Sequence, residues 1–112
     1  MRFGKAARLL RRREFLAVQE RGTRLVAGRY VVLALPSESG HARLGITVSS
    51  KVADSVVRNR VKRWLREAFR AASPALPPFD LVVIARSSAA AGGLAGAREA
   101  IAAAGRALSR GG

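Results

Sequence analysis

The stretch that decides the fold is residues 43–70, RLGITVSSKVADSVVRNRVKRWLREAFR. Apolar and polar side chains alternate over residues 43–50, which is the period of a half-buried strand. Asp54 and Ser55 then supply an N-cap, and the apolar residues after them recur every third or fourth position. That spacing predicts a helix that runs to about Ala72. A strand followed by a long basic helix therefore forms the centre of the predicted fold.

The predicted helix has two chemically different faces. On a helical wheel advanced by about 100° per residue, one arc is apolar and contains Val57, Val61, Trp64, Leu65, Ala68 and Ala72, with Phe69 at its edge. Outside this arc, residues 56–70 carry six basic side chains and one acid, Glu67. A face that only meets water normally mixes both signs, and like charges one turn apart repel. We therefore expect the apolar arc to dock on a sheet and the basic arc to bind a polyanion, rather than to be an ordinary solvated face.

The rest of the chain predicts a short helix over 11–20, a buried strand over 29–36, a strand over 80–86 and an alanine-rich helix over 91–110. Residues 37–42 have turn chemistry, so we expect the two strands that they join to be antiparallel. Residues 1–10 are expected to form a basic arm and residues 110–112 a frayed tail. This order of elements predicts a compact α+β sandwich, in which a sheet packs against helices.

The net charge indicates the kind of partner. Twenty-one Lys and Arg residues against seven Asp and Glu give a net charge of +14, which implies a polyanion and most commonly nucleic acid. Eighteen of the basic residues are Arg, whose planar guanidinium binds phosphate bidentately. With 112 residues, the chain is long enough for one small core, so residues 1–112 are predicted to be a single RNA-binding domain.

Other features of the sequence indicate the cellular compartment of the protein. The sequence has no cysteine, and therefore no disulfide framework or thiolate metal site. No apolar run approaches the ~20 residues that span a bilayer. The N-terminal stretch MRFGKAARLLRRREF is basic but has neither the apolar segment nor the cleavage site of a signal peptide. We therefore expect a cytoplasmic protein with no membrane partner.

No catalytic residue is expected in the protein itself. Its acids are scattered along the chain as Glu14, Glu20, Glu38, Asp54, Glu67, Asp80 and Glu99. Metal-assisted phosphodiester hydrolysis needs clustered carboxylates, so no protein metal site is expected either. His41, the only histidine, lies in a predicted turn and is expected to be exposed.

The kind of nucleic acid is indicated by the elements that surround the basic helix. A helix-turn-helix DNA reader is disfavoured, because the segment before the basic helix is a strand rather than a helix. RNA suits a basic α+β domain better. An RNA-binding subunit with a specific partner and a ribosomal protein or general RNA chaperone are both consistent with the composition.

Residues 43–70 also resemble the signature of the bacterial ribonuclease P protein subunit. The hallmark of that family is Arg-Asn-Arg within a basic helix that follows a Gly-x-x-Val-Ser strand, and both parts are present here. The resemblance extends to REF at 13–15, to the RYVVL strand and to DLVVIAR at 80–86, in the family's order. It implies an α-β-β-β-α-β-α sandwich with a four-stranded sheet and a left-handed βαβ crossover. Residues 23–27 would be its first strand.

The resemblance also implies a division of labour between protein and RNA. In the family, a large catalytic RNA with Mg²⁺ hydrolyses a phosphodiester bond and removes the 5′ leader of precursor tRNA. The protein is the accessory subunit of this ribonucleoprotein endoribonuclease. It docks on the RNA, one protein per RNA, and holds the single-stranded leader in a cleft between the first helix and the sheet. The Mg²⁺ would be held mainly by the RNA partner and the substrate.

Residue by residue, the resemblance assigns two sets of contacts. The RNA subunit would be contacted by Lys51, Arg58, Asn59, Arg60 and Arg63. The leader cleft would be lined by Phe15, Val32, Lys62 and Arg66.

The chain departs from the family pattern at three positions. Ser50 stands where the family often has a lysine, and Gln19 replaces a second aromatic residue one turn after Phe15. Ala34 stands where some members have Tyr. Tyr30 is therefore a candidate to supply the second aromatic contact with the leader.

Overall fold

The computed structural model describes residues 11–49 and 54–111. Along the chain it contains α1 (Arg12–Arg21), β1 (Thr23–Ala27), β2 (Tyr30–Pro36), β3 (Arg43–Val48), α2 (Ser55–Ala72), the 3-10 turn η2 (Ser73–Ala75), β4 (Phe79–Ala85) and α3 (Ala89–Gly111). The α+β class and the order α-β-β-β-α-β-α are confirmed, and β1 is the short first strand that the family resemblance implied.

One four-stranded sheet organises the molecule, with the spatial order β1-β2-β4-β3. β2 pairs antiparallel with both β1 and β4, whereas β3 pairs parallel with β4, and α2 connects these last two strands. β2 and β3 run in opposite directions, as the turn between them predicted, but they do not pair because β4 lies between them. β4 is buried at five of its seven positions. The central place in a sheet suits such a strand, since both of its faces are apolar.

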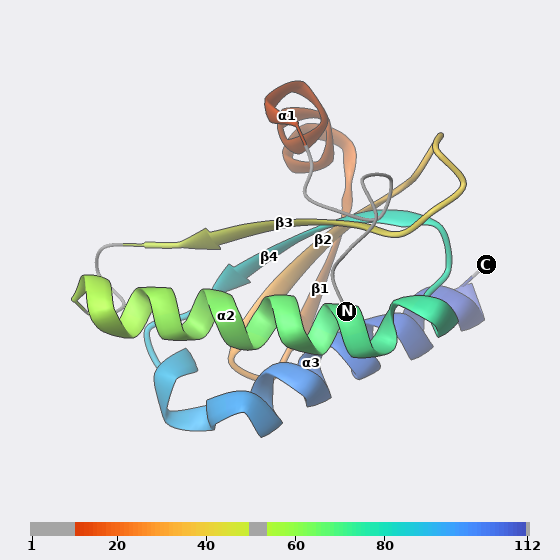
Figure 1. Cartoon of the computed structure of the whole chain (residues 1–112). Coiled ribbons are helices and arrows are strands. Elements are labelled where there is room, and N and C mark those ends of the chain that lie inside the picture. The colour runs from red at the N-terminus through yellow and green to blue at the C-terminus, as the bar shows by residue number, and fades with distance from the viewer. Residues whose placement is uncertain (1–10, 50–53, 112) are drawn as a thin grey trace.

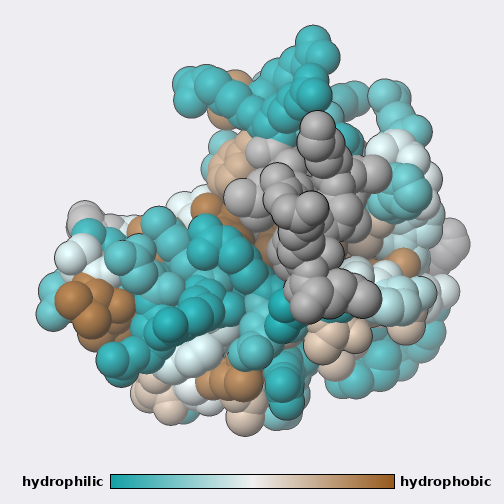
Figure 2. All heavy atoms as spheres, viewed as in Figure 1, coloured by the Kyte–Doolittle hydropathy of each residue, from teal (hydrophilic) through white to brown (hydrophobic). Residues whose placement is uncertain are grey.

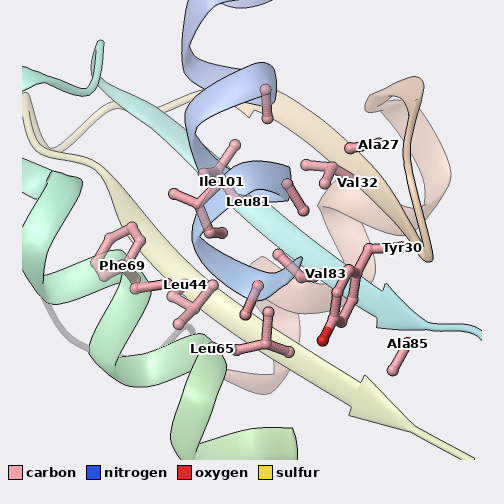
Figure 3. Close-up of a cluster of buried hydrophobic side chains, with 14 of the residues drawn as sticks. Ala27, Tyr30, Val32, Leu44, Leu65, Phe69, Leu81, Val83, Ala85 and Ile101 are labelled. Atoms are coloured by element: carbon pink, nitrogen blue, oxygen red, sulfur yellow. The ribbon is translucent and has the colours of Figure 1, made fainter. Parts of the chain in front are cut away.

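Helices cover the two faces of the sheet unequally (Figure 1). α2 and α3 pack side by side across one face, and α1 lies on the opposite face near one end. The main core fills the space between the sheet and the pair α2–α3. Figure 3 shows its larger side chains, which include Leu44, Leu81 and Val83 of the strands, Leu65 and Phe69 of α2, and Ile101 of α3.

α2 begins and ends where the sequence predicts. Asp54 is its N-cap, and the Asp54 carboxylate accepts a hydrogen bond of 3.0 Å from the backbone N–H of Val57. The buried side chains are those of the apolar arc, namely Val61, Leu65, Ala68 and Phe69. The wheel puts Phe69 at the edge of this arc, yet Phe69 is 0% exposed. The buried stripe is wider than the sheet alone requires, because α3 packs along α2 as well.

α3 is longer than predicted and is interrupted. Gly93 has a positive φ of 61°, which breaks the run of helical dihedral angles. The helix includes Arg110, so the tail expected over 110–112 does not begin at that residue, and Gly112 lies outside the described residues. Gly105 weakens a helix by its backbone entropy, but here it permits close packing. A Cβ at Gly105 would lie 2.8 Å from Cδ2 of Leu76.

Candidate nucleic-acid interface

The exposed side of α2 carries a continuous basic surface, which we call the basic face of α2. Its members line one shallow hollow and are Asn59, Arg60, Lys62, Arg63 and Arg66, with Val56 beside them. Within residues 11–49 and 54–111, no carboxylate pairs with any of these four cations. Figure 2, in the same view as Figure 1, shows that hydrophilic residues cover much of the surface over α2. Cations held at this density without acidic partners are suited to bind phosphate groups.

This face brings together residues from both predicted sets of contacts. Arg60 and Arg63 were assigned to the RNA subunit by the resemblance, and Lys62 and Arg66 to the leader, yet all four share one hollow. Arg58 is also on α2 and is half-buried, while Lys51 lies outside the described residues. Glu67, the one acid of this helix, has Oε1 3.9 Å from Nη2 of Arg70, in its last turn. The basic face is therefore not neutralised from within α2.

Phe15 lies apart from the basic face. It is half-buried on α1 and lines a hollow with Arg12, Leu16 and Gln19. Leu16 is 46% exposed. An aromatic ring and an apolar side chain beside a guanidinium can receive an unstacked base. Because α1 and α2 lie on opposite faces of the sheet (Figure 1), this hollow and the basic face are two surfaces rather than one pocket.

Val32, the β2 residue that the family resemblance assigned to the leader cleft, does not face α1. Val32 is 0% exposed and belongs to the core beneath α2 and α3, so it cannot line a cleft on the α1 side. Tyr30 and Ala34 share that core face and are 0% and 1% exposed, so Tyr30 does not supply a second aromatic contact. Val31 and Leu33 point to the α1 side instead, because successive side chains of a strand alternate. A shift of one residue exchanges the two faces of a strand.

An ion cluster that the sequence patterns did not predict joins α1 to the sheet. Arg43 of β3 donates through Nε and Nη2 to the two carboxylate oxygens of Asp80, at 2.8 and 2.9 Å. Its Nη1 donates to Oε2 of Glu14 at 2.7 Å. Oε1 of Glu14 accepts a hydrogen bond of 2.7 Å from the backbone N–H of Arg11. This backbone N–H, together with Arg43, lowers the pKa of Glu14, and the hydrogen bonds with Asp80 raise the pKa of Arg43.

One feature of the sequence points to this cluster. Asp80 is the only charged residue of the apolar strand β4, and it is 5% exposed. A charge buried to this extent needs a partner. The identity of the partner follows only from the β3–β4 register, in which Arg43 stands opposite Asp80.

The described residues do not fit a Mg²⁺ centre. Among them, no three His, Asp or Glu side chains gather in a way that could hold a metal ion. Glu14 and Asp80 are both hydrogen-bonded to Arg43. His41 is exposed in the turn between β2 and β3. None of the helices in the described ranges combines the length and hydropathy of a membrane span.

The fold and the basic helix agree with what sequence comparison finds. The family model described as Ribonuclease P matches residues 3–108. This chain belongs to the ribonuclease P family. The ribonuclease P protein component of Desulfatibacillum aliphaticivorans is 41% identical over 87 residues, which is 77% of this chain and 74% of that protein. That of Azotobacter vinelandii is 45% identical over 86 residues, 75% of this chain and 66% of that protein.

Solved structures of ribonuclease P proteins have the same fold. The protein from Thermotoga maritima has a TM-score of 0.78 at 34% sequence identity, and the match covers 88% of this chain and 94% of that one. The protein from Staphylococcus aureus has a TM-score of 0.79 at 27% identity, and the match covers 94% of this chain and 96% of that one.

Family membership sets the biological context. As a ribonuclease P protein component, the chain belongs to an endoribonuclease complex that acts in the 5′ processing of tRNA, and its partners are an RNA subunit and precursor tRNA. The family model spans almost the whole chain, and it favours the ribonuclease P protein over the alternative of a ribosomal protein or a general RNA chaperone.

Proposed function

We propose that this protein docks on the catalytic RNA subunit of ribonuclease P through the basic face of α2 and holds the 5′ leader of precursor tRNA beside α1. The observation that carries the proposal is the basic face itself, whose cations have no acidic partner within the described residues. Repulsion among these side chains has a cost in the free protein. Phosphate groups of the RNA would offset it. The proposed stoichiometry is one protein per RNA.

The contacts with the RNA subunit are proposed to come from Lys51, Arg58, Asn59, Arg60 and Arg63. A guanidinium presents parallel N–H donors that match two phosphate oxygens, so each Arg can fix the position of the RNA backbone as well as attract it. The Asn59 amide can both donate to and accept from a base edge or a sugar hydroxyl. Contacts of this kind would orient the protein on the RNA.

The leader is proposed to lie against α1 and the adjoining part of the sheet. Phe15 would stack on a base, and the apolar contact from β2 would come from Leu33, which is half-buried on the α1 side. Stacking does not depend on base identity, so the protein would hold leaders of different sequence. Lys62 and Arg66 share the hollow of Arg60 on the opposite face of the sheet from Phe15, so they would contact phosphates of the RNA bound to the basic face of α2 rather than the leader segment beside α1.

Hydrolysis of the phosphodiester bond is proposed to belong to the RNA subunit. Mg²⁺ would supply an activated water and stabilise the developing charge on the phosphate. The ion is proposed to be held by the RNA partner and the substrate. The protein would contribute binding and orientation, by fixing the RNA subunit on one side and the leader on the other.

Reconstitution tests this assignment. Rigorously RNA-free protein, the cognate RNA subunit with Mg²⁺, and the two together are each incubated with precursor tRNA, and the 5′ ends of the products are mapped. We expect no cleavage by the protein alone and a mature 5′ end with the assembled complex. Cleavage by the RNA-free protein would refute the division of labour. Failure of the protein to bind the RNA subunit would refute the docking surface.

A further inference from the structure

The cluster of Glu14, Arg43 and Asp80 is not part of either RNA contact described above. We propose that it is a positioning device, which holds α1 in place over the sheet and thereby sets the affinity for the leader without touching RNA. The inference rests on the proposed leader site beside α1.

Glu14, Arg43 and Asp80 join α1 to the sheet, and we call this cluster the tether. Arg43 uses Nε and Nη2 for Asp80 and Nη1 for Glu14, so its guanidinium reaches both partners at once. The side chains of Arg43, Glu14 and Asp80 are 17%, 25% and 8% exposed. Ion pairs that are partly buried are screened less than those in open water. Arg43 and Asp80 belong to the sheet, so Glu14 is the member whose loss would release α1.

The other attachments of α1 are small. The helix has ten residues, and Val18 is its one fully buried side chain. Phe15 and Ala17 are half-buried, and Leu16 is exposed. A helix of this length is marginal on its own and depends on tertiary contacts for its stability. The hydrogen bond from Arg43 to Glu14 therefore contributes a large part of what holds α1 in place over the sheet.

The tether is close to the proposed leader contact but separate from it. Glu14 and Phe15 are neighbours in the chain, so a movement of one moves the other. Their side chains line different hollows, Glu14 with Ala17 and Arg43, and Phe15 with Leu16. Loss of the Glu14 carboxylate would thus displace the ring of Phe15 without removing a group that touches the leader.

A matched pair of variants tests the inference. Glu14→Gln removes the charge that attracts Arg43 and keeps an oxygen that can accept from the backbone N–H of Arg11. Glu20→Gln is the control, because Glu20 is an exposed acid on the same helix without a partner among the described residues. Each substitution removes one negative charge, which by itself raises affinity for RNA. A loss of affinity in Glu14→Gln would therefore oppose the simple electrostatic effect.

Two measurements are made on each variant. The first is the dissociation constant of the assembled holoenzyme for precursor tRNA and for mature tRNA, which has no leader. The second is amide hydrogen exchange of α1 in the free protein. We expect Glu14→Gln to weaken precursor binding by about three- to tenfold, to leave mature tRNA binding nearly unchanged, and to speed exchange in α1. Glu20→Gln should do none of these.

The outcomes separate the inference from the proposed function. Faster exchange with unchanged discrimination between precursor and mature tRNA would overturn the positioning role, as would lost discrimination with unchanged exchange, or no change in either. Phe15→Ala serves as the reference for the leader site. If Phe15→Ala lowers discrimination and Glu14→Gln does not, the inference alone fails. If Phe15→Ala has no effect either, the leader site fails and the inference fails with it.

Discussion

The two faces of β2 can be separated by substituting adjacent residues. Val32→Ala removes two methyl groups from a side chain that is 0% exposed. At about 0.8 kcal/mol for each buried carbon and with a contribution from the cavity left behind, we expect a loss of about 1.5–3 kcal/mol in the free energy of unfolding. At roughly 4 °C per kcal/mol, this lowers Tm by about 6–12 °C. Leu33 is only half-buried, so Leu33→Ala should cost about 1 kcal/mol or less.

For RNA binding, Leu33→Ala should have a larger effect than Val32→Ala. Well below Tm, Val32→Ala should leave the ratio of precursor to mature tRNA affinity unchanged. Leu33→Ala should reduce this ratio by about two- to fivefold, because it removes an apolar contact on the α1 side. Thermal melting by circular dichroism and equilibrium binding by the holoenzyme provide the two readouts. An unchanged Tm with lost discrimination in Val32→Ala would show that Val32 lines the cleft and would refute the assignment of faces.

Three further predictions follow from the same surfaces. Arg60→Ala combined with Arg63→Ala should weaken assembly with the RNA subunit and leave Tm unchanged. The slope of log K against log salt should become less steep by about 0.7–0.9 for each lost contact. Unfolding of this variant would contradict the orientation of α2. Phe15→Ala should weaken precursor binding by roughly five- to a hundredfold with little change for mature tRNA, whereas equal losses for both, with a large fall in Tm, would make Phe15 a structural residue. The pKa of Glu14 is lowered from 4.5 in the folded protein, so its contribution to stability is present above that pH and is lost as the pH falls through the folded pKa. The free energy of unfolding, measured with urea across this acid range, should depend less on pH in Glu14→Gln than in Glu20→Gln. An equal pH dependence in the two variants would argue against the tether.

Local sequence determined α1, α2, α3, β2, β3 and β4 as separate elements, whereas β1 was implied only by the family resemblance. The N-cap at Asp54 and the proline after Ala72 set the ends of α2, because capping and backbone restriction act within a few residues. The spacing of its apolar residues set which side of α2 is buried. The Arg-Asn-Arg segment of this helix, together with the Gly-x-x-Val-Ser strand before it and the matching segments elsewhere, resembled the ribonuclease P family. The excess of Arg over the whole chain pointed to a polyanionic partner. The cap, the proline and the spacing of the apolar residues each act within a short stretch of chain.

Tertiary structure alone decided how the elements meet. Alternation in β2 divides its residues into two sets, but both sets are apolar, so the pattern does not say which one faces α2 and α3. Placing Val31 rather than Val32 on the α1 side required the packed sheet. The insertion of β4 between β2 and β3 depends on the burial of both of its faces, and it sets the register that brings Arg43 opposite Asp80. Glu14 then completes the cluster from 29 residues away in the chain, because the energy of such long-range contacts depends on the whole fold and leaves no periodic trace in the sequence.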